Sequence, residues 1–523
     1  MPSLILLLGT FQMCVVAATP SVSPSPPSTT PSTPSPDVTY SSSRLHELGS
    51  RSQHLLRHIM MHSCGVKETS NMKKKLLRNT DVTCNDGSPA GYFIRRARGS
   101  QKWIVFLEGG WYCFDHVSCS ERSRVMPEYM SSRYWTKFRS GSGILSWDPE
   151  ENPYYFHSNV VYVPYCSSDS WSGTRNKTSA MDFSFMGSLI LDEVFDELLK
   201  KGMKQAKTVI LAGTSAGGTG VLINIDRIAD LIHSKEPSIE VKGLVDAGWF
   251  LDNEPFKVKT CRDAFTCSPV AGIQRGYQVW SPKLPEACTA QHPTEVWRCF
   301  FGHRVFPTIK SPVYVIQNLY DAAQIKVSSV FEERPKTELS ADQWRYLLSL
   351  GEEVKQSLQN VTAVFAPACV SHEILIQPEW HTVRIQGTSL PESIYCWETS
   401  GTKMPSCQNS SIESVLLKND TPLADAPPKG TNKRKKKKKG KKNKKNNRNR
   451  KLDRGSVTRN SRSVVKRCQR RLIDECPWPH CNCSCPKCRW ETMTEVNNFF
   501  LKTLATVMGI DPAKMASSKL CGY

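Results

Sequence analysis

Short apolar runs alternate along this chain with longer stretches in which apolar residues recur at helical spacing. Four of these runs are bounded by loop residues and are typical of buried strands: 103–107, 159–164, 208–212 and 312–316. Helical spacing is found in three stretches: 185–199, 221–232 and 343–358. Gly202 is placed to end the first of these helices. Strands that alternate with helices predict an α/β fold with a mostly parallel sheet and helices on both faces.

The ends of the chain and one internal stretch depart from this pattern. Residues 4–18 are mostly apolar and stop before Pro20, which predicts a secretory signal peptide over 1–18. The Pro-, Ser- and Thr-rich residues that follow, 19–43, predict a disordered leader. We expect the rest of the chain to comprise three parts. They are a catalytic body at 44–400, a disordered insertion at 401–467 that is first polar and then basic, and a Cys-rich C-terminal segment at 468–523.

The positive charge of the chain is concentrated in one segment. Between Lys429 and Arg471 there are 22 Lys or Arg residues and one acid, Asp453, so this segment carries the entire formal net charge of +21. A nuclear-localisation or nucleic-acid-binding role for the Lys cluster at 435–439 does not fit a secreted chain. Secretion favours binding to heparan sulfate or similar glycosaminoglycans and retention at the cell surface. A solvated loop without a specific partner is the alternative.

The 20 cysteines also indicate an extracellular protein, because disulfides persist in oxidising compartments. Five cysteines near the C-terminus are spaced poorly for zinc, and we expect disulfides there: Cys476, Cys481, Cys483, Cys485 and Cys488. Nineteen cysteines follow Cys14 within the predicted mature chain, so one is free or pairs between chains, and the sequence does not determine the connectivity. N-x-Ser/Thr sequons at Asn176, Asn360, Asn409 and Asn419 are compatible with glycosylation.

The segment Gly213-Thr-Ser215-Ala-Gly217 contains the best candidate nucleophile. It fits the pattern of a nucleophile elbow, in which a Ser occupies a tight strand-to-helix turn and Gly residues let strand and helix approach closely. An idle Ser in a Gly-rich turn is the alternative. The partners of such a Ser follow it in the order acid, then His. The acid candidates are Asp321 and Asp246, and the His candidates are His372, His233, His292, His303, His381 and His480.

A second Gly pair follows the first predicted strand, in Glu108-Gly109-Gly110-Trp111. It is similar to the oxyanion loop of α/β-hydrolases, whose backbone amides approach the substrate oxygen. The expected oxyanion donors are the backbone N–H groups of Gly110, Trp111 and Ala216, and the alternative is a plain Gly-rich turn.

Six longer motifs together resemble the pectin acetylesterase family. They are Leu-Glu-Gly-Gly-Trp111-Tyr-Cys-Phe, Gly-Thr-Ser215-Ala-Gly-Gly-Thr-Gly, Asp246-Ala-Gly-Trp-Phe-Leu-Asp, Cys299-Phe-Phe-Gly, Phe365-Ala-Pro-Ala-Cys-Val-Ser-His372-Glu and Cys476-Pro-Trp-Pro-His-Cys. The resemblance covers residues 45–486, apart from the basic segment. It implies an α/β-hydrolase-like, disulfide-rich fold in which the basic segment is a surface loop and the Cys-rich segment packs on the catalytic body.

The resemblance also implies an activity and its residues. The catalytic triad would be Ser215, His372 and Asp321, and the enzyme would need neither a metal nor an organic cofactor. Within the family the motifs are most similar to a secreted carboxylesterase that removes palmitoleate from a Wnt serine and so lowers Wnt signalling. The expected acyl pocket is formed by Trp111, Tyr112, Phe250, Ile273, Phe300, Phe301, Ala323, Val327 and Ile374. The alternatives are a carbohydrate O-acetylesterase and a catalytically weak glycosaminoglycan- or Wnt-binding protein.

Overall fold

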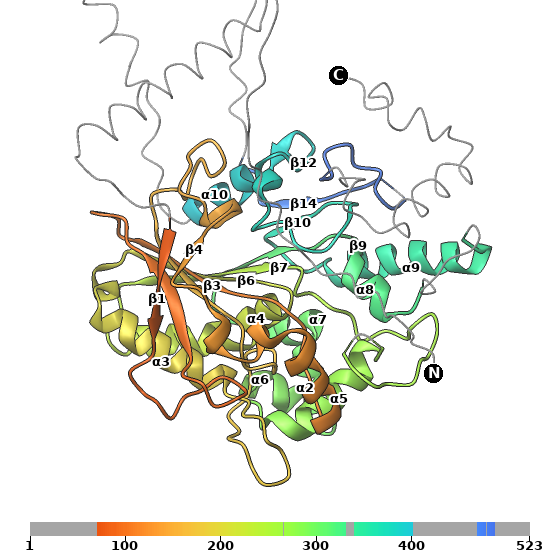
Figure 1. The fold of residues 1–523 in the computed structure, drawn as a ribbon. Coiled ribbons are helices and arrows are strands. Elements are labelled where there is room, and N and C mark those ends of the chain that lie inside the picture. The colour runs from red at the N-terminus through yellow and green to blue at the C-terminus, as the bar shows by residue number, and fades with distance from the viewer. Residues whose placement is uncertain (1–70, 265, 331–338, 401–467, 477, 487–523) are drawn as a thin grey trace, which may run out of the picture. The chain divides into compact units, whose positions relative to one another are not determined.

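A ten-stranded sheet forms the centre of the described chain (Figure 1). The computed structural model describes residues 71–264, 266–330, 339–400, 468–476 and 478–486. The strands are β1 (Asn71–Leu76), β2 (Gly91–Arg95), β3 (Lys102–Leu107), β4 (Phe138–Ser140), β5 (Asn159–Val163), β6 (Thr208–Thr214), β7 (Glu240–Asp246), β8 (Val313–Ile316), β10 (Val364–Ala366) and β14 (Arg471–Ile473). Their order across the sheet is β14-β10-β8-β7-β6-β3-β5-β2-β1-β4.

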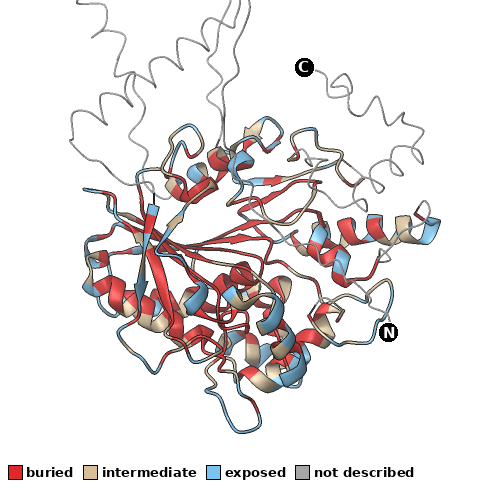
Figure 2. Ribbon diagram, in the orientation of Figure 1, coloured by how far each residue is buried: buried red, intermediate tan, exposed pale blue. Residues whose placement is uncertain are grey.

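The sheet is parallel from β14 to β5 and antiparallel from β5 to β4. Every residue of β5 and β6 is buried, as expected for parallel strands that are covered on both faces (Figure 2). Two small sheets lie beside it: β9 (Tyr320–Asp321) pairs with β11 (Val370–Ser371), and β12 (Arg384–Ile385) pairs with β13 (Thr388–Ser389).

Helices lie on both sides of the sheet. In Figure 1, α3 and α4 lie below it and α10 lies above it, where the Trp397 ring of α10 packs on Tyr314 of β8 with the ring centroids 5.4 Å apart. The helices are α2 (His116–Val125), α3 (Gly187–Lys200), α4 (Ala216–His233), α5 (Pro269–Trp280), α6 (Glu286–Gln291), α7 (Gly302–Val305), α8 (Ala322–Val327), α9 (Ala341–Ser357) and α10 (Leu390–Thr399). Short 3₁₀ helices include η5 (Val296–Phe300). No helix in the described ranges is both long and apolar enough to span a membrane.

The predicted α/β class is confirmed. The four predicted strands correspond to β3, β5, β6 and β8, and the three helical stretches correspond to α3, α4 and α9. Gly202 follows α3 with a φ of 105°, the left-handed conformation expected where a helix ends. The central strand β7 was not predicted, because Glu240 and Lys242 interrupt its apolar pattern near the start.

Residues 468–476 and 478–486 of the Cys-rich segment contact the body at several points. Strand β14 pairs in parallel with β10, and the amide of Ala368 donates to Asp474 Oδ2 at 2.9 Å. The disulfides are Cys84–Cys166, Cys113–Cys119, Cys261–Cys267, Cys288–Cys299, Cys369–Cys485, Cys396–Cys468 and Cys476–Cys481. Cys483 is also disulfide-bonded. The predicted signal peptide, leader and basic insertion, and residues 487–523, lie outside the described residues.

Candidate active site

Ser215 occupies the turn between β6 and α4. Its backbone has φ 54° and ψ −123°, an unfavourable conformation for a residue with a side chain and one that is found at nucleophile elbows. A Cβ at Gly217 would lie 2.1 Å from the carbonyl oxygen of Leu107, and one at Gly213 would lie 2.4 Å from the carbonyl oxygen of Gly217. The two glycines are therefore required by the close approach of strand and helix around Ser215.

His372 and Asp321 complete a hydrogen-bonded chain with Ser215. The Nε2 atom of His372 lies 2.8 Å from Ser215 Oγ, and its Nδ1 atom lies 2.8 Å from Asp321 Oδ2. The β9–β11 pair brings the two residues together, since Ser371 is in register with Asp321. The other oxygen of Asp321 accepts hydrogen bonds from the amides of Ala323 and Gln324 at the start of α8, which holds the carboxylate in place.

Charges around His372 set its protonation. Burial lowers the pKa of the imidazole, but the carboxylate of Asp321 and, to a lesser extent, those of Glu373 and Asp246 outweigh burial and raise it to about 9. Burial raises the pKa of Glu373 itself, which directly follows His372 in the chain. The site therefore favours the protonated form of His372.

Five of the other candidate partners form hydrogen bonds with groups other than Ser215 Oγ. Asp246 is close in the sheet, but its carboxylate bonds to the backbone amides of Ile374 and Leu375 and not to a His ring. Four of the remaining His side chains are bonded elsewhere: His233 to Ile239, His303 to Asp252, His381 to Pro378 and His480 to Val370.

The predicted oxyanion loop runs directly beside Ser215. A Cβ at Gly109 would lie 2.8 Å from the Cβ atom of Ser215, so only Gly allows this approach. Gly110 and Trp111 have φ of 136° and 60°, both in the left-handed region. Glu108 anchors the loop by accepting a hydrogen bond from the amide of Tyr165 at 2.9 Å. Ala216, the third predicted donor, opens α4, so its amide lies at the positive end of that helix dipole.

An apolar pocket opens next to Ser215. It is open to solvent and lies among α4, α5, η5 and the loops after β3 and β7. Seven of the nine predicted pocket residues line it: Trp111, Tyr112, Phe250, Ile273, Phe300, Phe301 and Val327. Ala323 and Ile374 are buried but are not among its lining residues. Sequence reasoning did not assign Ser170, Thr219 and Pro269 to the pocket, although they also line it; Thr219 lies within the motif around Ser215, and the other two lie in none of the quoted motifs.

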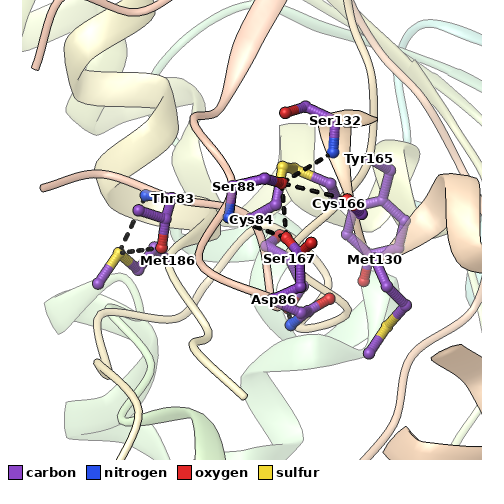
Figure 3. The surroundings of a disulfide bond; sticks show 12 residues. Thr83, Cys84, Asp86, Ser88, Met130, Ser132, Tyr165, Cys166, Ser167 and Met186 are labelled. Carbon is purple, nitrogen blue, oxygen red and sulfur yellow. Dashed lines mark hydrogen bonds between the residues drawn. A yellow bond between two sulfur atoms is a disulfide. The ribbon is translucent and has the colours of Figure 1, made fainter. Parts of the chain in front are cut away.

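Rigid neighbours hold two walls of this pocket. Tyr112 packs edge-on against Trp280, with 5.5 Å between the ring centroids, and Trp280 donates to the carbonyl oxygen of Cys113. On another wall, the Cys84–Cys166 disulfide fixes the chain four residues before Ser170 (Figure 3). Beside this disulfide, Ser88 accepts a hydrogen bond from the amide of Ser132 at 3.0 Å. The described residues contain no group of three His, Cys, Asp or Glu side chains placed to hold a metal ion.

Comparison with known proteins places the chain in a family. The profile of the Pectinacetylesterase family matches residues 66–421. The chain is 41% identical over 468 residues to the palmitoleoyl-protein carboxylesterase NOTUM of Mus musculus, an alignment that covers 87% of this chain and 82% of that protein. Identity to the Homo sapiens protein of the same name is 40% over 467 residues, or 87% and 83% of the two chains. The Drosophila melanogaster protein of that name is 43% identical over 352 residues, 66% of this chain and 51% of that protein.

Proposed function

Because this chain belongs to the pectinacetylesterase family, we propose that it is a secreted serine carboxylesterase that removes palmitoleate from a serine of Wnt proteins. The observation that carries the proposal is the opening of an apolar pocket beside a Ser215–His372–Asp321 chain of hydrogen bonds. The similar proteins of mouse, human and fly are named palmitoleoyl-protein carboxylesterases, which supports this substrate class. Such an enzyme would lower Wnt signalling.

The chemistry follows from the geometry. Ser215 Oγ attacks the acyl carbonyl carbon while His372 Nε2, 2.8 Å away, takes its proton. Backbone amides of Gly110, Trp111 and Ala216 stabilise the oxyanion. His372 then gives the proton to the leaving seryl oxygen, and water cleaves the acyl-enzyme by the same steps in reverse order. Asp321 holds the imidazole in the required tautomer throughout.

The lining of the pocket favours a substrate with a long acyl chain over one with a short acyl chain. Its seven predicted lining residues are aromatic or aliphatic and none is charged. Each methylene that is buried there contributes about 0.8 kcal/mol, which is up to about fourfold in kcat/KM. An acetyl group would leave most of these walls without contacts.

A series of soluble esters tests the proposal. We would measure kcat/KM for acetyl, butyryl, hexanoyl and octanoyl esters of one fluorogenic alcohol, with Ser215→Ala as the blank. A steep rise toward octanoyl is expected. A synthetic peptide that carries palmitoleate on a serine, followed by mass spectrometry, then tests the protein substrate. A flat or falling series would contradict the lipid pocket and favour the carbohydrate O-acetylesterase, for which the family description is the supporting observation.

Two further properties belong to the proposal. The segment at 429–471 carries the whole net charge, which supports binding to heparan sulfate and retention at the cell surface. Asn176 and Asn360 are exposed, which supports glycosylation of these two sequons. Two more of the predicted sites, Asn409 and Asn419, lie outside the described residues. Enzymatic removal of N-glycans, with peptide mapping, tests each site.

A further inference from the structure

Asp246 contacts both halves of the candidate catalytic machinery. It ends β7, in register with Thr214 of β6, and its carbonyl oxygen accepts a hydrogen bond from the amide of Ser215 at 2.8 Å. Its Oδ2 atom accepts from the amide of Ile374 at 2.9 Å and from that of Leu375 at 2.8 Å. These two amides follow His372 by two and three positions. One residue thus bonds to the chain at the nucleophile and to the chain just after the base.

The environment of the Asp246 carboxyl group is unusual for a side chain with a purely structural role. The residue is fully buried, and its Oδ1 atom has no hydrogen-bond partner within the described residues. Burying such an oxygen without a partner costs free energy, so a purely structural position would favour an apolar side chain. The two hydrogen bonds at Oδ2 instead provide an acceptor for the backbone amides of the buried residues Ile374 and Leu375.

We propose that Asp246 is a positioning residue that holds the backbone of the His372 segment at the distance from Ser215 that proton transfer requires. Asp321 acts on the imidazole ring itself, whereas Asp246 acts on the main chain that carries the ring. Without the Asp246 carboxylate, the turn after His372 would contain two buried unpaired amides and would shift. A shift of about 1 Å at a reacting group can lower the rate by about 100-fold. The inference rests on the proposed roles of Ser215 and His372, but not on the identity of the acyl-protein.

Asp246 also acts on His372 through its charge. The groups that face the imidazole are Asp321 at the start of α8, Ser215 at the start of α4, Phe250 after β7, and the carboxylates of Glu373 and Asp246. Burial raises the pKa of Asp246 to about 7, so its carboxylate is ionised at pH 8 to 9, where His372 titrates. Asp246→Asn keeps an acceptor oxygen and removes the charge, and it should therefore move the acid limb of the kcat/KM profile to lower pH.

Asp226 provides a matched control. Its carboxylate also accepts hydrogen bonds from two consecutive backbone amides, those of Lys310 at 2.9 Å and Ser311 at 2.8 Å, but it lies on α4 away from the His372 segment. Loss of this carboxylate removes the same kind of contact without touching the machinery around Ser215.

The test compares wild type, Asp246→Ala, Asp246→Asn and Asp226→Ala on a soluble butyryl ester, with active sites counted by a fluorophosphonate probe. Per active site, Asp246→Ala is expected to lower kcat about tenfold or more and to change KM by less than about threefold. Asp246→Asn should retain most of the wild-type kcat, and Asp226→Ala should have the wild-type kcat. The acid limb should move down by about 0.5 pH unit or more in both Asp246 variants, since both lose the carboxylate charge, and should stay in place in Asp226→Ala.

Two results would overturn the inference: wild-type kcat per active site in Asp246→Ala, or an equal loss in Asp226→Ala. If Asp246→Ala does not fold, Asp246→Asn alone still tests both parts of the inference. An acid limb at the wild-type pH in Asp246→Asn would overturn the electrostatic part. Slow labelling of Asp246→Asn by the fluorophosphonate would overturn the positioning part, because this variant retains the acceptor oxygen. Absence of Ser215-dependent hydrolysis in wild type would instead contradict the proposed function, so the two failures are distinguishable.

Discussion

His372 Nε2 and Ser215 Oγ lie 2.8 Å apart although 157 positions separate the two residues in the chain. The contact depends on strand order: β6, β7, β8 and β10 are neighbours, and all run in the same direction. The loops at their carboxyl ends therefore meet at one edge, where the elbow after β6, Asp321 after β8 and His372 after β10 converge.

Removing the nucleophile should abolish turnover without unfolding the protein. Ser215→Ala is expected to lower kcat by several orders of magnitude, because no other group forms the acyl-enzyme. Asp321→Asn should also lower kcat strongly, since an amide leaves His372 in the wrong tautomer. Ester hydrolysis and circular dichroism of the purified variants check this, and near-normal turnover in Ser215→Ala would contradict the mechanism.

The pH profile should rise through the alkaline range. In the proposed mechanism only neutral His372 accepts the proton of Ser215, and the net effect of its surroundings raises the pKa of His372 to about 9. In the free enzyme, kcat/KM should therefore increase about tenfold per pH unit below pH 9 and level off above it. Residual activity of Asp321→Asn should level off at lower pH, because the carboxylate that raises the pKa is lost. A profile that is flat from pH 6 to 9 would contradict this assignment.

Narrowing the pocket should affect long chains selectively. Val327 is buried and lines the pocket, so Val327→Trp would fill space that an octanoyl chain needs. We expect kcat/KM for octanoyl esters to fall about tenfold or more and that for acetyl esters to change little. Ala323→Trp is a less informative change, since Ala323 does not line the pocket. Equal losses for both esters would indicate misfolding and not a block.

The elbow should not tolerate a methyl group at Gly217. The new Cβ would lie 2.1 Å from the backbone oxygen of Leu107, which cannot move without displacing β3. We expect Gly217→Ala to abolish secretion of active enzyme. As a control, Gly99→Ala adds a methyl group in open space at a φ of 78° and should cost only about 1 kcal/mol of stability. Secreted yield and thermal unfolding distinguish the two.

Deleting residues 429–467 should weaken heparin retention and leave hydrolysis of soluble esters unchanged. The segment from Lys429 to Arg471 carries all the net charge, and polycation–polyanion affinity is mainly electrostatic. The elution salt on a heparin column is the measurement, and deletion of the Pro-rich leader at 19–43 is the control. Elution of the 429–467 deletion at the wild-type salt concentration would locate the cationic surface on the folded body.

The sequence by itself determined the α/β class and the Ser215 elbow, because both depend on local patterns: apolar runs, helical spacing and a Gly pair at fixed offsets. The residue pattern did not choose between Asp321 and Asp246, or among six His residues, because these choices depend on which loops meet across the sheet. Only the family resemblance favoured one set of residues. Tertiary structure decided them: Asp321 faces the His372 ring through the β9–β11 pair, whereas Asp246 faces two backbone amides. The pocket positions of Ser170, Thr219 and Pro269 are likewise set by packing, which leaves no periodic signal in the sequence.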